Sequence, residues 1–261
     1  MASSAQADSG GQFPFYFEVA GAPYSQYSMS DFNAYVEQHN ISHPNTYFDE
    51  VDRGQFINLE GGFLLPLGSS EPREYIHPRP SLGLGAAFSG MRVNPASSPN
   101  HTLELETLGL GPTLRFFGPL AIGSQHGLLF DIRGELAGLF ANGTLGDGQR
   151  YTIIPPGDFR GFGYMGVITA GVSYYGERLE DLVPGQGHVG VGLDVGYRHG
   201  RVPTVTYRDG THEGEPLRTC ATNDDGGCRD ERANDPEHFG DEIGMDFSGY
   251  FFRIKLLYLD F

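Results

Sequence analysis

Large apolar residues alternate with small or charged residues along most of this chain. Because successive side chains of a β-strand point to opposite faces, a period of two predicts strands whose two faces differ in chemistry. In one such segment, Val191 and Leu193 alternate with Gly192 and Asp194. Eight segments follow this pattern, and they span about 12–20, 55–67, 81–93, 102–117, 127–144, 160–175, 188–202 and 246–261.

The polarity of the two faces decides which kind of β-structure these segments form. One face is continuous Leu, Ile, Val, Phe and Tyr, whereas the other carries glycine, small residues and charges. A soluble barrel places its large apolar residues inside, but an eight-stranded barrel has room only for side chains there, which suits the glycine-rich face. We therefore predict an all-β fold, a closed antiparallel up-and-down transmembrane β-barrel of eight strands. A soluble β-barrel or sandwich stays open as the alternative.

The small-residue face carries ten charged side chains, five acidic and five basic. Equal numbers of opposite charges are what a packed, charge-compensated interior needs. We predict that they form a network of ion pairs that plugs the interior, and the alternative is a narrow path for water or ions. Eight strands are too few for an open solute pore. The ten residues are Glu18, Glu60, Arg115, Asp131, Arg133, Glu135, Asp194, Arg198, Arg253 and Lys255.

The connections between the segments fall into two sets. Those after odd-numbered strands include the two longest, about 21–54 and 203–245, and those after even-numbered strands are shorter. Long loops at one end and shorter turns at the other are typical of outer-membrane barrels. We expect one domain over 12–261, preceded by a flexible tail over 1–11. Ala5-Gln6-Ala7 in this tail fits the end of a signal peptide, with a plain polar tail as the alternative.

Residues 28–39 break the strand pattern and predict a short helix in the first long loop. Phe32, Tyr35 and Val36 fall at i, i+3 and i+4, which places them on one helical face, and a serine can cap the start. Such a helix can cover the mouth of the barrel, lie on the membrane surface or meet a partner. We favour the first reading, in which it packs on the rim of its own barrel.

The last long loop is the most acidic part of the chain. Residues 209–246 hold twelve acidic residues. Asn223, Asp224, Asp225 and Asp230 provide oxygen ligands beside glycines, so a Ca²⁺ site is one reading, and a solvated acidic loop is the other. No further cofactor is expected.

The two cysteines of the chain, Cys220 and Cys228, lie in the same loop and suit a disulfide in an oxidising compartment. Two free thiols are the alternative. The histidines of this loop lack the spacing of metal ligands on a regular element. We interpret them as ordinary loop residues.

The final segment, Gly249-Tyr-Phe-Phe-Arg-Ile-Lys-Leu-Leu-Tyr-Leu-Asp-Phe261, together with the strand count and the face chemistry, resembles the small bacterial outer-membrane barrels of the OmpA-like, OmpX-like and OmpW-like class. The resemblance implies a bacterial outer-membrane location, with periplasmic termini and extracellular long loops. It also implies that Leu259 and Phe261 carry the signal for the barrel-assembly machinery. Counting alternate residues back from Phe261, however, places these two residues on the same strand face as Arg253 and Lys255. We therefore predict a bulge near Leu256–Leu257 that moves the last residues to the opposite face.

The resemblance further implies a surface-exposed structural or binding protein whose partners are the bilayer, the assembly machinery and an extracellular ligand or protein. A narrow OmpW-like channel for small or apolar solutes is the alternative.

Charge and motifs narrow these functions further. A formal net charge of −16 argues against a nucleic-acid partner, because phosphate binding needs a basic face. No run approaches the roughly 20 apolar residues of a membrane-spanning helix. The chain lacks GxSxG, HExxH, Walker and dinucleotide-binding motifs, so we do not expect an enzyme. A hydrolase or acyl transferase at the rim, built on His101 with Glu104, Glu106 and Ser97 or Ser98, is the weakest alternative.

Overall fold

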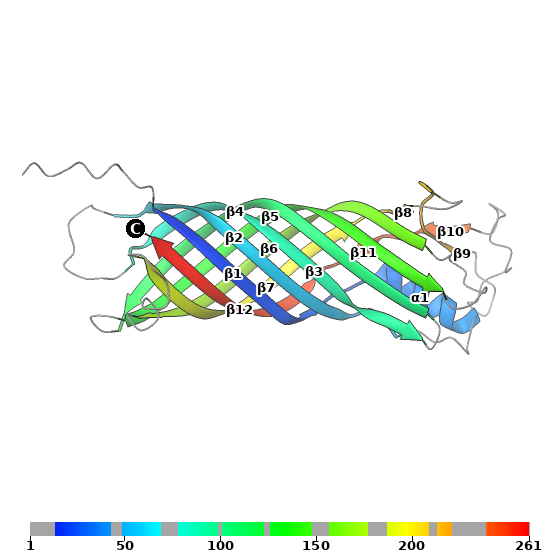
Figure 1. Cartoon of the computed structure of the whole chain (residues 1–261), viewed down its shortest axis with the longest axis horizontal. Helices are drawn as coiled ribbons and strands as arrows, with labels where there is room; N and C mark the ends of the chain where they lie inside the picture. Colours follow the sequence, from blue (N-terminus) through cyan, green and yellow to red (C-terminus); the bar gives the residue numbers. More distant parts are fainter. Residues whose placement is uncertain are drawn as a thin grey trace, which may run out of the picture.

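The alternating segments form one antiparallel sheet in a computed structural model of the chain. The long strands carry most of the alternating residues, and the connections between them fall at two ends (Figure 1). The structure describes residues 14–42, 49–68, 78–98, 101–122, 126–147, 157–176, 187–208, 213–220 and 239–260.

Eight long strands are the main elements. They are β1 (Phe15–Gln26), β2 (Arg53–Pro66), β3 (Ser81–Ser98), β4 (His101–Ala121), β5 (His126–Asp147), β6 (Gly157–Gly176), β7 (His188–Val202) and β12 (Gly249–Asp260). The shorter elements are α1 (Ser30–Ser42), β8 (Val205–Tyr207), β9 (Arg218–Cys220), β10 (Phe239–Glu242) and β11 (Met245–Asp246).

The eight long strands close into a ring of pairings. Each pairs antiparallel with the next along the chain, β7 pairs with β12, and β12 pairs with β1. The short strands β8 and β11 extend the ring by pairing with β6 and β7. The all-β prediction and the count of eight strands are therefore confirmed, with strands β1, β3, β5 and β6 reaching further toward the long loops than their patterns predicted.

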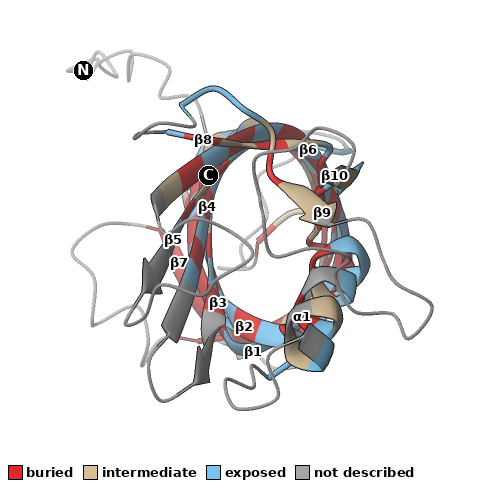
Figure 2. Ribbon diagram, turned by 90° about the vertical axis from the view of Figure 1, so that its right-hand side faces the viewer, coloured by how far each residue is buried: buried red, intermediate tan, exposed pale blue. Residues whose placement is uncertain are grey.

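The two faces of the strands differ as the alternation requires. On β1, Phe17 is 47% exposed, whereas the neighbouring Tyr16 and Glu18 are 1% and 0% exposed. The same contrast repeats around the ring, as the end-on view of Figure 2 shows by the alternation of buried and exposed residues. Large apolar side chains therefore cover the outside, and the small and charged residues line the inside.

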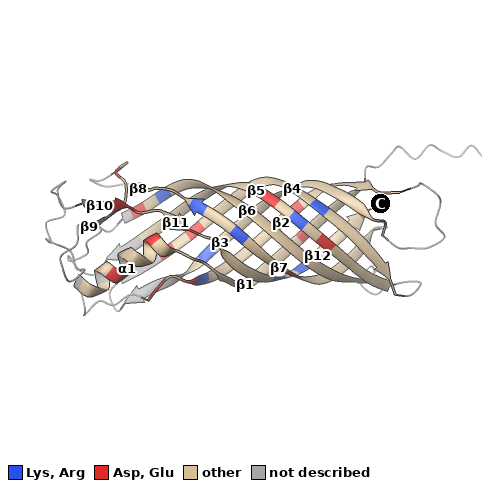
Figure 3. Ribbon diagram, turned by 180° about the vertical axis from the view of Figure 1, so that it is seen from behind, with Lys and Arg blue, Asp and Glu red and all other residues tan. Residues whose placement is uncertain are grey.

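The inside of the ring is divided into three layers along its length. At the end near the C-terminus lies an apolar layer that includes Tyr16, Phe117 and Leu257. Further along the same strands come the buried charges, and Figure 3 colours the charged positions along the strands. Beyond them, toward α1, lies a larger apolar layer that includes Phe56 and Leu139. We call these the lower apolar layer, the charged layer and the upper apolar layer.

The predicted bulge in the last strand is wrong. β12 runs in unbroken register against β7 from Gly249 to Leu259, and against β1 from Ile254 to Asp260. Leu257 and Leu259 are buried on the same face as Lys255, because the inside of the ring changes there from the charged to the lower apolar layer. The strand therefore has apolar residues on both faces without changing phase. Phe261 lies outside the described residues.

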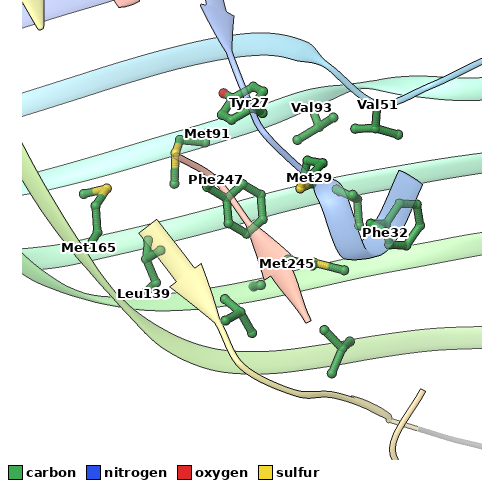
Figure 4. Packing of buried hydrophobic residues seen from close by; sticks show 14 of the residues in the cluster. Tyr27, Met29, Phe32, Val51, Met91, Val93, Leu139, Met165, Met245 and Phe247 are labelled. Atoms are coloured by element: carbon green, nitrogen blue, oxygen red, sulfur yellow. The ribbon is translucent and has the colours of Figure 1, made fainter. Parts of the chain in front are cut away.

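The helix α1 packs onto the ring that carries it. Phe32 and Val36 are 1% and 2% exposed and belong to the upper apolar layer, as the close-up in Figure 4 shows for Phe32 beside Met29 and Met245. This agrees with the reading of the helix as a lid on its own rim. No helix among the described residues has the length and apolar character needed to cross a membrane.

Candidate functional site

The structure buries all ten charged residues that the sequence placed on the small-residue face. Each has between 0% and 3% of its surface exposed. They reach the interior because the continuous registers keep them in phase on β1, β2, β4, β5, β7 and β12. The interior of the ring therefore gathers ten buried charged side chains, and we take it as the candidate site.

Six of the charges form a closed circuit of ion pairs. Arg115 Nη2 lies 2.5 Å from Glu18 Oε2 and 2.7 Å from Asp131 Oδ1. Lys255 Nζ contacts Asp131 and lies 2.5 Å from Asp194 Oδ1. Arg253 Nη2 closes the circuit, at 2.6 Å from Asp194 Oδ2 and 3.0 Å from Glu18 Oε1. Every member therefore has two partners of opposite charge.

A second circuit shares Arg115, Glu18 and Arg253 with the first. From Arg115 it passes through Glu60, Arg133 and Glu135, with Arg133 Nε 2.5 Å from Glu60 Oε2. It returns through two neutral side chains. Ser89 Oγ donates to Glu135 Oε1 at 3.1 Å, Asn58 Nδ2 donates to Ser89 Oγ at 2.9 Å, and Arg253 Nη1 donates to Asn58 Oδ1 at 3.1 Å.

Neutral side chains that the sequence analysis did not single out complete the network. Tyr16 OH and Thr113 Oγ1 both donate to Glu60 Oε1, at 2.8 and 2.9 Å. Together with Asn58 and Ser89 they bind carboxylate and guanidinium atoms that ion pairs leave open. Their inward phase was readable from the alternation, but their partners depend on the registers between strands.

The strand β6 contributes space to the network instead of charge. A Cβ atom at Gly171 would overlap Asp194 Oδ1 and lie 2.5 Å from Lys255 Nζ. Glycine at this position therefore lets the Lys255–Asp194 pair lie against the wall of the ring. This gives one inward glycine a specific role.

Arg198 does not join the network, which corrects the predicted pairing of five acids with five bases. Its guanidinium donates to Phe247 O at 2.6 Å and to Ser25 Oγ at 3.1 Å, and lies 4.6 Å from the centre of the Tyr27 ring. The network itself holds five carboxylates and four cations, so 4 − 5 gives a formal charge of −1. Arg198 instead ties the strand ends to the segment that precedes β12.

The numerous partners in the network offset the cost of burying its charges. Burying a charge carries a desolvation cost of several kcal/mol, which ion pairing offsets when geometry is good and the remaining polar atoms are bonded. Here each carboxylate of the first circuit meets two cations. The two apolar layers then separate these charges from both ends of the ring. Chemically, the arrangement is a core of paired charges between hydrophobic layers, in which Arg133 Nη1 is one buried atom without a hydrogen-bond partner among the described residues.

Several predicted site residues fall outside what the structure describes. Cys228 and the proposed calcium ligands at 223–225 and 230 are among them, and the Cys220 side chain is not described, so the disulfide and the Ca²⁺ site stay predictions. No group of three or more metal-ligating side chains occurs in the described parts of the chain.

The predicted rim group around His101 stays a prediction, because the side chains of Ser97 and Ser98 lie outside those that the structure describes. Glu104 and Glu106 both face Arg92, at 3.7 and 3.5 Å, and the His101 side chain is not described. These two carboxylates are therefore engaged by a surface arginine.

Comparisons with known proteins do not assign this chain to a class of protein. No protein-family model matches the chain, and no curated protein matches it.

Proposed function

We propose that this chain is an integral outer-membrane protein, a closed eight-stranded transmembrane β-barrel whose interior is sealed. Its function in this proposal is structural or binding, exerted at the cell surface through its acidic loops. The observation that carries the proposal is the inverted polarity of the ring. Charged side chains are buried inside, and a continuous belt of large apolar side chains is exposed outside.

The height of the apolar belt supports a bilayer as its solvent. On β5, outward residues are apolar or glycine from Leu128 to Phe140, and Asn142 and Thr144 follow. Twelve steps of ~3.3 Å, on a strand tilted by ~40° as in typical barrels, span about 30 Å along the axis. That height suits the hydrocarbon thickness that outer-membrane barrels cover, on the order of 25–30 Å.

Aromatic side chains at the loop end of the belt fit the same picture. Tyr164, Tyr197 and Tyr250 are exposed on neighbouring strands, and the rings of Tyr197 and Tyr250 lie 5.0 Å apart. Tyrosines concentrate where hydrocarbon meets head groups, because the ring is apolar and the hydroxyl is polar. The long loops would then extend beyond this level, toward the cell exterior, with the chain ends on the periplasmic side.

The layered interior favours a sealed barrel over a conducting one. The lower apolar layer contains Phe117 and Leu257, both fully buried, directly below the charges. Water or ions would have to cross this layer to use the charged layer as a path. The upper apolar layer supports the second candidate, a narrow channel for apolar solutes, because it offers an apolar interior on the loop side.

The acidic loops support a role in binding at the surface. With a net charge of −16 and twelve acidic residues in 209–246, the loop end suits cationic partners or divalent cations. Insertion would use the barrel-assembly machinery, with Leu259 and Phe261 in the terminal signal.

Two measurements test this function. Purified protein should need detergent to stay in solution and should migrate faster on a gel when unheated, because a folded barrel resists unfolding. In planar bilayers it should give no discrete conductance steps. Solubility without detergent and no change on heating would refute the barrel, and reproducible openings would refute the seal.

A further inference from the structure

A serine and a histidine meet at the loop end of β7, where His199 is exposed on the outer face and Ser248 has 7% of its surface exposed. Ser248 Oγ lies 2.9 Å from His199 Nδ1, and the two residues are 49 positions apart in the sequence. The register brings them opposite each other, because Met245 pairs with Val202 and Gly249 with Arg198. Neither residue belongs to the charged interior described above.

The surrounding hydrogen bonds hold the serine in place beside the histidine. The backbone N–H of Gly200 donates to Ser248 Oγ at 3.3 Å, so the hydroxyl oxygen already has a donor. In the tautomer that carries its proton on Nε2, His199 Nδ1 accepts the hydroxyl hydrogen of Ser248; in the other tautomer Nδ1 donates to Ser248 Oγ. Asp246 Oδ1 accepts from the backbone N–H of Ser248 at 2.8 Å and holds the turn. A serine donating to a neutral histidine is the arrangement of an activated nucleophile and its base.

The pair lies where the esters of membrane lipids would lie if the ring spans a bilayer. The His199 ring is 6.0 Å from the ring of Tyr164, within the tyrosines at the loop end of the apolar belt. His199 and Arg201 are both exposed and follow the last apolar residues of β7 on the same face. Below the pair the surface is apolar enough for acyl chains, and Arg201 brings a positive charge to the level of head groups.

We propose that Ser248 and His199 form a nucleophile–base pair that hydrolyses acyl esters of membrane lipids. The inference rests on the membrane location proposed above, and it adds an activity that the sequence analysis had set aside. The pair escaped sequence reasoning because it forms between two strands and has no local motif.

The reaction balances with water as the only co-reactant. Ser248 Oγ bonds to the ester carbonyl carbon while His199 Nδ1 takes the hydroxyl proton. The tetrahedral adduct then breaks its bond to the alcohol oxygen, which leaves with that proton. Water attacks the acyl-serine, again giving a proton to His199, and the fatty acid departs as serine regains its hydrogen. No electron transfer is involved.

Lipid turnover by the full chain tests the proposal. Protein reconstituted in vesicles of phosphatidylethanolamine and phosphatidylglycerol with labelled acyl chains should release free fatty acid. S248A and H199Q should each lower the rate at least ~100-fold, the usual size of the loss for such groups. S28A is the matched control, because Ser28 is an exposed serine beside Ser248 that touches it only through the backbone. No turnover by the wild type, or turnover retained in S248A, would overturn the proposal.

Two further readouts separate this failure from failure of the barrel. A fluorophosphonate probe should attach to Ser248, as located by mass spectrometry, and this labelling should be lost in H199Q. Labelling that is absent, or that is equal in the wild type and H199Q, contradicts the pair. The heat-dependent gel shift of each variant reports folding independently, so an inactive protein that still shifts rejects the activity alone.

Discussion

The charged layer and the upper apolar layer occupy the same ring but are held together by different forces. In the charged layer, every member of the first circuit has two partners of opposite charge. Removing one side chain therefore leaves a buried charge without one of its partners in a surrounding of low dielectric constant. The upper layer is filled by apolar volume and includes Met29, Met91, Met165 and Met245. Methionine adapts to irregular space, so this layer tolerates change. Ion pairs determine the arrangement of the charged layer, whereas the packing of apolar side chains determines that of the upper apolar layer.

The largest effect should come from removing a shared cation in the charged layer. Arg115→Met leaves Glu18, Glu60 and Asp131 without their common partner and should lower the free energy of unfolding by ~3–5 kcal/mol. Urea titration in detergent micelles, followed by gel shift or circular dichroism, measures this loss. Arg92→Met is the control, since this exposed arginine pairs only at the surface, where such pairs contribute ~0–1 kcal/mol. Equal losses for the two variants would mean that the charged layer does not hold the ring.

A somewhat smaller effect is expected where the two layers meet, at Arg198. Arg198→Met removes the donors to Phe247 O and Ser25 Oγ and should cost ~2–3 kcal/mol, the range for hydrogen bonds to a charged group. The effect should be local. Hydrogen exchange should rise in segment 243–248 while β4 and β5 stay protected. Uniform loosening of the ring would assign Arg198 to the charged layer instead.

Filling the space beside the network should cost less again. Gly171→Ala forces Asp194 and Lys255 apart and should destabilise by ~1–3 kcal/mol through overpacking. Gly134 is the matched control on the neighbouring strand, because nothing lies within 4 Å of a Cβ there. Thermal unfolding of both variants measures the two losses of stability. A loss for Gly134→Ala as large as that for Gly171→Ala would show that strand propensity, not overlap with the network, causes the destabilisation.

The smallest effect should be seen in the upper apolar layer. Met91→Leu and Met165→Leu keep volume and polarity, so each should change stability by less than ~1.5 kcal/mol. Chemical denaturation of the two variants measures it. A loss that matches Arg115→Met would remove the distinction between the layers.

Much of this architecture was readable from the sequence, because alternation reports directly which residues share a face. The eight strands, the inward phase of Glu18 and Asp194 and the helix in the first loop all follow from period and local chemistry. The last strand was misjudged at Leu257, since a change from a charged to an apolar interior looks the same in sequence as a change of phase.

The features that could not be predicted from the sequence depend on contacts between strands. The alternation predicts only that Arg198 points inward with the other charges. The fold shows that its guanidinium lies over the ring of Tyr27 and does not pair with a carboxylate. The pairing of Ser248 with His199 likewise needs the register of the segment before β12 against β7. Such registers join residues that no local pattern links.

The central claim is that the outer face of the ring meets lipid while the inner face is sealed. Photoactivatable acyl chains in reconstituted vesicles test it residue by residue along a single strand. We predict cross-links at the exposed Leu136 and Phe140 of β5 and none at Leu139, which is 0% exposed on the opposite face of that strand. Equal labelling of Leu139 and Leu136, or no labelling of any outward residue, would contradict the account.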